Sequence, residues 1–276
     1  MNNPLVSILM TVYNREKYIA EAIQSILHST YQNWELIIVD DRSRDRSVEI
    51  ARQFEKEDER IKVYVNEVNL GDYPNRMKAA SYASGKYIKY LDSDDLIYPH
   101  GLEVMVSAME KFPDAAIGLS YNAYEEDEPL PLMLTPAEAL QIHFFKKGIL
   151  YIGPTGTIFR SEVFRELKGF ENYGVASDYE FNLRMAMERP IVLFNRDLVW
   201  WRKHDNQEIK LHEEKYYHQN DRIIKAVLNS PNFPLNSSKK KEISINYKKS
   251  IARKIMHHFF KLEIKKCKVI KKNKKT

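Results

Sequence analysis

The sequence is poor in cysteine and in long apolar runs. Its one cysteine, Cys267, allows no disulfide within the chain and excludes a metal site built on several thiolates. No apolar run reaches the roughly 18 residues of a membrane-spanning helix, and the first residues lack the pattern of a secretory signal. We therefore expect a reducing compartment and a cytoplasmic protein, whose contact with a membrane would be peripheral.

The overall composition is that of an ordinary globular protein. Hydrophobic residues make up 43% and charged residues 29% of the 276 residues, which excludes a disordered or fibrous chain. This length suits one large domain with an appended element.

The net charge of +5 is unevenly distributed. From Lys239 to Thr276, fifteen Lys or Arg residues face two glutamates, a net charge of +13 that leaves −8 for the rest of the chain. An acidic body with a basic tail argues against nucleic-acid binding over the whole surface. It predicts an anionic partner for the tail alone.

The first half alternates apolar runs with helical patterns, which is typical of parallel strands joined by crossover helices. The fold class predicted is α/β, with a mostly parallel central sheet flanked by helices. The expected strands cover residues 6–12, 36–39, 61–65 and 87–91. The expected helices cover residues 18–28, 43–54 and 75–83, and a further helix follows Pro99.

The second half is less regular. Residues 125–136 are acidic and contain proline, which predicts an exposed loop, and Ser161 is expected to cap a helix. The expected strands are 155–160, 191–194 and 199–202, and the expected helices are 137–145, 178–187 and 213–229. Residues 230–238, with two prolines, two asparagines and three serines, predict a linker.

Acidic residues directly follow two of the predicted strands. Asp40 and Asp41 end one strand, and Asp92, Asp94 and Asp95 follow another. Open α/β sheets bind ligands at the carboxyl ends of their strands. Three carboxylates within four residues repel one another unless a cation or solvent compensates, so the run predicts either a Mg²⁺ or Mn²⁺ site or a solvated turn.

Three other candidates admit two interpretations each. Asp178 opens a predicted helix, so it is either a functional carboxylate or an N-cap. His204 is either a ligand or a structural histidine, and Tyr13 belongs either to a binding site or to the core.

Taken together, these positions resemble the family 2 glycosyltransferases, which have the GT-A fold. The resemblance covers residues 4–207 as an ordered series of motifs. In the first half the motifs are VSILMTVYNR (6–15), IQSI (23–26), LIIVDDRS (36–43), NLG (69–71), Arg76, ASGKYI (83–88) and LDSDDL (91–96). In the second half they are GPTGTIFR (153–160), GF (169–170), SDYEFNLR (177–184) and WRKH (201–204).

The resemblance implies roles for individual residues. Asp178 would be the catalytic base and Asp94 the direct metal ligand. His204 would help to bind the metal or the diphosphate, at a position where family members vary. Asp92 would lie nearer the ribose and could share the metal, and Asp95 would lie nearer the donor sugar. The other implied nucleotide-sugar contacts are Thr11, Tyr13 stacking on the base, Asn14, Asp40 accepting from the base, Asp41, Arg76 and Ser93.

The implied activity is inverting transfer of a sugar from a nucleotide-diphosphate donor, with UDP favoured and Mn²⁺ or Mg²⁺ as cofactor. Residues 1–120 would bind the nucleotide and residues 121–229 the acceptor, a glycan or a lipid-linked one of bacterial surface polysaccharide. Ser177 and Met77 depart from the Glu and Asn common in the family, so the groups that orient both substrates stay open.

Two rival functions remain. A nucleotidyltransferase of related fold would need a glycine-rich phosphate loop, which the start of the chain lacks. A non-catalytic, membrane-associated glycan-binding protein would not need Asp94 and Asp178, so their presence counts against it.

Residues 239–276 predict a basic amphipathic helical tail. The apolar residues recur at spacings of three or four: Tyr247, Ile251, Ile255, Phe259 and Leu262. Such a helix can bind an anionic membrane surface at the inner face of the plasma membrane, close to a lipid-linked acceptor. Equally, it can pack on the body or on a second subunit in a homodimer. Nucleic acid is the least favoured partner, and we expect disorder after Lys265.

Overall fold

The structure is a computed structural model that describes residues 3–121, 129–203, 213–251 and 253. The chain divides into two compact units, Met1–Pro234 and Leu235–Thr276. In the second unit, residues 237–251 form a helix. The rest of the predicted basic tail, residues 254–276, lies outside the described residues. Over the residues described, none of the helices has the length and apolar character needed to span a bilayer.

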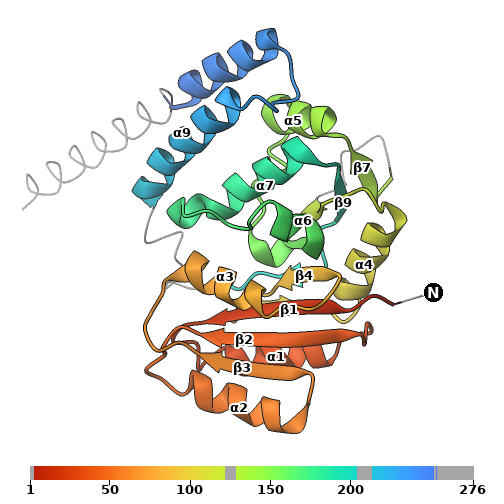
Figure 1. Cartoon of the computed structure of the whole chain (residues 1–276), viewed down its shortest axis with the longest axis vertical. Coiled ribbons are helices and arrows are strands. Elements are labelled where there is room, and N and C mark those ends of the chain that lie inside the picture. Colours follow the sequence, from red (N-terminus) through yellow and green to blue (C-terminus); the bar gives the residue numbers. More distant parts are fainter. Residues whose placement is uncertain (1–2, 122–128, 204–212, 252, 254–276) are drawn as a thin grey trace, which may run out of the picture. The chain divides into compact units, whose positions relative to one another are not determined.

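Within the described residues, the first unit is built on an eight-stranded sheet in the order β3-β2-β1-β4-β8-β6-β9-β7 (Figure 1). The first four strands in this order run parallel to one another: β3 (Ile61–Val65), β2 (Trp34–Asp40), β1 (Val6–Val12) and β4 (Tyr87–Tyr90). The other four are β8 (Thr157–Arg160), β6 (Ile117–Tyr121), β9 (Ile191–Asn195) and β7 (Leu132–Leu134). Strand β8 is antiparallel to β4 and β6, whereas β6 and β9 are parallel. The predicted α/β fold with a mostly parallel central sheet is confirmed.

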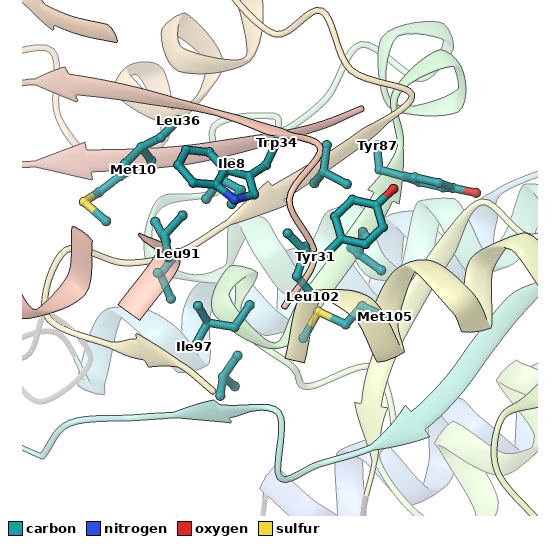
Figure 2. Close-up of a cluster of buried hydrophobic side chains, with 14 of the residues drawn as sticks. Ile8, Met10, Tyr31, Trp34, Leu36, Tyr87, Leu91, Ile97, Leu102 and Met105 are labelled. Atoms are coloured by element: carbon teal, nitrogen blue, oxygen red, sulfur yellow. The ribbon is translucent and has the colours of Figure 1, made fainter. Parts of the chain in front are cut away.

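Helices cover both faces of the parallel half of the sheet. Helix α3 (Asp72–Ser81) contacts β1 and β2. The opposite face packs on α1 (Ile19–Leu27), α2 (Ser47–Glu57) and α4 (Gly101–Lys111) through a buried cluster that contains Ile8, Met10 and Trp34 (Figure 2). Side chains alternate between the two faces of a strand, so Ile8 and Met10 enter this cluster and Leu9 does not.

The remaining elements are a two-stranded sheet and four helices. They are β5 (Leu96–Ile97) paired with β10 (Val199–Trp200), and the helices α5 (Pro136–Phe145), α6 (Ser161–Glu166), α7 (Ser177–Glu188) and α9 (Glu213–Asn229). Thr135 caps α5 in a reciprocal capping box with Glu138.

Three expectations from the sequence were wrong in detail. Ser161 is not the N-cap of α6, because its amide still donates to Lys86 O beside the sheet, and the cap position falls to Arg160. The expected loop at 125–136 contains strand β7, which pairs with β9. Strand β6 was not expected, and it pairs with both β8 and β9 in the middle of the second half.

Candidate active site

The loops after β1, β2 and β4 open together at one edge of the sheet. A cavity of about 580 Å³ lies there. Its lining includes most of the residues that the sequence singles out: Thr11, Tyr13, Asp41, Arg76, the run Asp92–Asp95, and Asp178. Asn14 and Asp40 do not line it, and His204 lies outside the described residues. Residues from both halves of the chain thus meet in one cavity.

The loop after β1 carries the exposed ring of Tyr13 and the cation Arg15. Tyr13 is 43% exposed and lines the cavity, so its ring is not part of the core. Asn14 has a left-handed backbone, with φ of 54°, and ties this loop to the next. Its amide donates to Ser43 Oγ at 2.8 Å, and its Oδ1 accepts from the Arg44 amide at 2.8 Å. Asn14 therefore shapes the site from outside the cavity.

The two aspartates after β2 have different surroundings. Asp41 Oδ1 accepts from the Leu70 amide and Oδ2 from the Gly71 amide, at 2.7 and 2.8 Å, so this side chain fixes the loop that precedes α3. Asp40 is 1% exposed and its Oδ1 accepts from the Ser43 amide at 2.8 Å. Its buried Oδ2 has no hydrogen-bond partner in the described part of the chain. Asp40 does not line the cavity, so its expected contact with a base stays a prediction.

The acidic run after β4 is held by cations from other elements. Asp92 Oδ1 lies 2.7 Å from Arg76 Nη1, and Asp94 Oδ2 lies 3.0 Å from Arg15 Nε. Asp95 Oδ1 accepts from the amide of Arg202 at 3.0 Å. The mutual repulsion of the three carboxylates is therefore offset by guanidinium groups and a backbone N–H, and the run is not a freely solvated turn.

The protonation states of this run differ. Burial raises the pKa of Asp95 to about 7, and the negative charge of Asp92 acts in the same direction. Burial would also raise the pKa of Asp92, but the charge of Arg76 and its hydrogen bond outweigh it, so that pKa is lowered. At neutral pH, Asp92 is thus a stable anion.

Asp178 lies in the first turn of α7 and is partly buried. It is not the N-cap, a position held by Ala176. Its amide donates to the Tyr73 hydroxyl at 3.2 Å, and its Oδ1 accepts from the Tyr179 amide at 2.7 Å. Burial raises the pKa of Asp178 to about 6, against the opposing hydrogen bond from Tyr179. A carboxylate with a pKa near 6 is a stronger base than an ordinary aspartate and is still ionised at neutral pH.

The acidic run has the chemistry of a divalent-cation site that a substrate completes. Asp92 and Asp94 supply carboxylate oxygens on the cavity wall, the ligands that Mg²⁺ and Mn²⁺ favour. Among the described residues, no group of three His, Cys, Asp or Glu could hold a metal by itself. Mg²⁺ commonly takes one or two carboxylates and fills its other positions with phosphate oxygens and water, so these residues fit a metal that arrives with a diphosphate.

Several residues at this site were not predicted to act there. Arg15 pairs with Asp94, Tyr73 bonds the Asp178 amide, and Arg202 bonds Asp95 and also the Asp94 carbonyl, at 2.9 Å. Arg15 and Arg202 belong to the motifs 6–15 and 201–204, and this membership was the sequence signal that could have identified them. Tyr73 has no such signal in the sequence, because its role depends on contact with Asp178, 105 positions away.

The sheet is mixed, and the cavity lies at the carboxyl ends of its parallel strands. An aspartate run and a separate aspartate with a raised pKa line this cavity, which is the arrangement expected of a GT-A glycosyltransferase. The family comparison agrees. Residues 7–168 match the model of "Glycosyl transferase family 2", and the chain belongs to that family.

Two relatives illustrate the similarity. An uncharacterized glycosyltransferase, MJ1057, of Methanocaldococcus jannaschii is 31% identical over 79% of this chain and 78% of its own. The Escherichia coli protein WfgD, named UDP-Glc:alpha-D-GlcNAc-diphosphoundecaprenol beta-1,3-glucosyltransferase, is 42% identical over 45% of this chain and 47% of its own.

Solved structures share the fold. S. aureus TarS 1–349 in complex with UDP-GlcNAc superposes with a TM-score of 0.69 at 20% identity, covering 88% of this chain and 71% of that one. Mannosyltransferase PcManGT from Pyrobaculum calidifontis, in complex with GDP-Man and Mn²⁺, gives a TM-score of 0.66 at 16% identity, covering 84% and 68%.

Proposed function

We propose that the protein is an inverting glycosyltransferase that moves a sugar from a nucleotide-diphosphate donor, a UDP-sugar in the first instance, to an acceptor hydroxyl. One observation carries the proposal. The same cavity is lined by the acidic run Asp92–Asp95 and by Asp178, whose pKa is suited to a base. Direct displacement at a sugar carbon needs both a site for the leaving diphosphate and a base for the acceptor.

The donor would bind along the β1 and β2 loops. The exposed ring of Tyr13 offers a stacking face for a nucleobase, and Thr11 lines the cavity beside it. The UDP named for WfgD and for the TarS complex supports uridine as the first base to test.

Asp92 and Asp94 would hold a divalent cation together with the donor diphosphate. A bound Mn²⁺ or Mg²⁺ would neutralise the charge that builds on the leaving diphosphate. The Mn²⁺ in the PcManGT complex supports this choice of metal. Arg15 and Arg76 pair with these carboxylates and hold them in place on the cavity wall.

Asp178 would act on the acceptor. One of its carboxylate oxygens takes the hydroxyl proton as the acceptor oxygen forms a bond to the anomeric carbon. The bond from that carbon to the diphosphate oxygen breaks, and the nucleoside diphosphate leaves with the electron pair. A single displacement inverts the configuration at the anomeric carbon. The amide of Tyr179 holds Oδ1 at 2.7 Å and so orients the carboxylate.

The acceptor class proposed is a glycan or lipid-linked glycan of bacterial surface polysaccharide. The lipid-linked acceptor in the name of WfgD supports it, as does the similarity to a putative teichuronic acid biosynthesis glycosyltransferase, TuaG, of Bacillus subtilis. The basic residues 239–276 would bring the enzyme to an anionic membrane surface where such an acceptor is found.

The test is the slow hydrolysis of donor sugars, which needs no knowledge of the acceptor. Purified protein is incubated with UDP-glucose, UDP-GlcNAc or GDP-mannose and Mn²⁺, and the anomer first released is identified by proton NMR. We expect release from one donor, with a β-anomer from an α-linked sugar. An α-anomer would contradict inversion, and an unchanged rate in Asp178→Asn would contradict the assigned base.

A further inference from the structure

One turn of helix α3 carries two side chains that reach two different parts of the site. Tyr73 and Arg76 are three residues apart, so they lie on the same face of the helix. Both line the cavity, and both are nearly buried, at 7% and 8% exposure. Arg76 Nη1 lies 2.7 Å from Asp92 Oδ1, and the Tyr73 hydroxyl accepts from the Asp178 amide at 3.2 Å. The same helical turn thus contacts the acidic run and the assigned base.

The anchoring of α3 fixes the position of this turn. Helix α3 packs on β1 and β2, and Tyr73 brings it to the start of α7 (Figure 1). The Tyr90 hydroxyl on β4 donates to the Arg76 carbonyl at 2.9 Å. Asp41 accepts from the two amides that precede the helix, at 2.7 and 2.8 Å. The helix is therefore fixed relative to β4, the strand that leads into the acidic run.

The ring of Tyr73 is held in place by its neighbours. It packs edge-on against Phe170, with ring centroids 5.2 Å apart and an interplanar angle of 70°. Arg76 Cζ lies 5.7 Å from the centroid of the Tyr73 ring. Arg76 is itself held through its Nε by Asp72 Oδ1, at 2.8 Å. The packing around the ring therefore directs the phenol oxygen at Asp178.

The phenol is a hydrogen-bond donor and not a second base. Burial raises the pKa of Tyr73 well above its usual value, and the negative charge of Asp178 acts in the same direction. The hydroxyl therefore keeps its proton at neutral pH. Burial is the largest influence on Asp178 and raises its pKa, whereas the hydrogen bond from the Tyr73 side chain lowers it. The phenol thus stabilises the ionised carboxylate, which is the form that takes a proton.

We propose that Tyr73 is the positioning residue of the base: its phenol holds the Asp178 carboxylate in the orientation that receives the acceptor proton. Arg76 on the same turn of α3 holds Asp92, so one turn of helix sets the separation between the base and the diphosphate site. This inference rests on the proposed function. Direct displacement needs the acceptor oxygen, the anomeric carbon and the leaving oxygen in line, and a misplacement of about 1 Å costs on the order of 10²-fold in rate.

The test removes only the hydroxyl. Tyr73→Phe keeps the ring against Phe170 and Arg76 but has no polar atom to hold Asp178. The measurement is the slow hydrolysis of the radiolabelled donor sugar that wild type accepts, with Mn²⁺, at about pH 8, where Asp178 is ionised in both proteins. We expect kcat to fall by about tenfold or more, because the base is no longer aligned. The Kd for UDP should stay within about twofold, which also reports intact folding.

Tyr87→Phe is the matched control. The ring of Tyr87 is fully buried, its hydroxyl donates to Glu110 Oε1, and the residue lies outside the cavity lining. The substitution therefore removes a tyrosine hydroxyl of the same kind away from the base. Its kcat for donor hydrolysis should equal that of wild type.

A double-mutant cycle shows whether Tyr73 acts through the base. In the Asp178→Asn background, Tyr73→Phe should change kcat by less than about twofold, because the carboxylate that Tyr73 positions is already gone. A side chain that only packs would lower kcat by the same factor in both backgrounds. The cycle therefore separates a positioning role from a structural one.

The pH profile gives a second readout that a packing role would not move. Tyr73→Phe removes a hydrogen bond that lowers the pKa of Asp178, so the acidic limb of the kcat/KM profile should move upward by about 0.5–1 pH unit. The charged side chains that also act on Asp178, Arg76 and Asp72 of α3, are the same in both proteins. Tyr87→Phe should keep the wild-type midpoint.

Three results would each overturn the inference while leaving the proposed function in place. They are a kcat for Tyr73→Phe within about twofold of wild type, an equal fold-loss in the Asp178→Asn background, and an acidic limb that does not move. Failure of wild type to hydrolyse any donor, or unchanged hydrolysis in Asp178→Asn, would instead overturn the proposed function itself.

Discussion

Replacement of Asp178 by Asn should raise stability while removing activity. The carboxyl has its pKa raised from 3.8 to about 6 by burial, so the ionised form destabilises the fold. A shift of about two units corresponds to ~3 kcal/mol, and the partial exposure of the side chain reduces the net effect to ~1–3 kcal/mol. Asparagine keeps Oδ1 for the Tyr179 amide and carries no charge.

The pH dependence of this effect has a definite sign. The folded-state pKa of Asp178 lies above the unfolded value, so its contribution to stability is fully present below about pH 4 and is lost as the pH rises through 6. Wild type and Asp178→Asn should therefore unfold at similar urea concentrations at pH 4. At pH 7.5 the variant should be more stable, as measured by circular dichroism without metal or nucleotide.

Activity should move the other way. Loss of a general base typically costs 10²–10⁴ in kcat, so donor turnover by Asp178→Asn should fall by about that factor with UDP affinity retained. In wild type the acidic limb of the kcat/KM profile should have a midpoint near pH 6. Asp95, with a pKa of about 7, adds a second ionisation to this profile. The acidic limb of the kcat/KM profile must therefore be compared between wild type and Asp178→Asn. Activity within threefold of wild type, or a less stable variant at pH 7.5, would refute the reasoning.

Three further substitutions test packing and access. Gly153→Ala should change the free energy of unfolding in urea by no more than about 0.5 kcal/mol, because the new Cβ would meet only Asp178 Oδ2, at 3.8 Å. Donor turnover should nevertheless drop, because the methyl group narrows the approach to the base. A variant that is both stable and fully active would contradict this prediction. Gly118→Ala should cost about 1–3 kcal/mol, since its Cβ would lie 2.6 Å from the ring of Phe194, and an unchanged urea midpoint would show that β6 can yield. Trp34→Ala should lower the free energy of unfolding by about 3–5 kcal/mol, because Trp34 is 2% exposed and its removal leaves a cavity. Trp34→Phe should lower it much less, because Nε1 makes no hydrogen bond within the described residues. Equal losses of stability in the two variants would contradict this account.

The parallel half of the fold was predictable from the sequence because its signals are local. The bounds of β1 and β3 match the expected strands to the residue. Strand β1 (VSILMTV) is a mostly apolar run, and in β3 the apolar residues Ile61, Val63 and Val65 alternate with Lys62 and Tyr64. The polar residues after β1, β2 and β4 follow from where those strands end. Strand β6 was not predictable in this way. Its five residues, IGLSY, are short and contain a glycine, and their pairing with β8 and β9 is not encoded in any local pattern.

The site was predictable as a set of residue types and less so as a set of contacts. The acidic run was visible, but its pairing with Arg15 joins residues 79 positions apart. Asp40 was expected in the binding cavity, whereas the turn after β2 directs one of its oxygens to the Ser43 amide. The cavity lined by Lys147, Tyr151 and Arg196 had no sequence signal, because these residues share no motif and are brought together by the fold alone.

The most direct test of the central claim is titration calorimetry of the purified protein with UDP, GDP and dTDP, each with and without Mn²⁺, repeated on Asp94→Ala. Asp94 lines the cavity and pairs with Arg15, so its removal takes one proposed metal ligand from the donor site. We predict that one nucleotide, UDP first, binds only with Mn²⁺ and that Asp94→Ala loses this binding. Absence of nucleotide binding under every condition, or metal-dependent binding that survives in Asp94→Ala, would contradict the account.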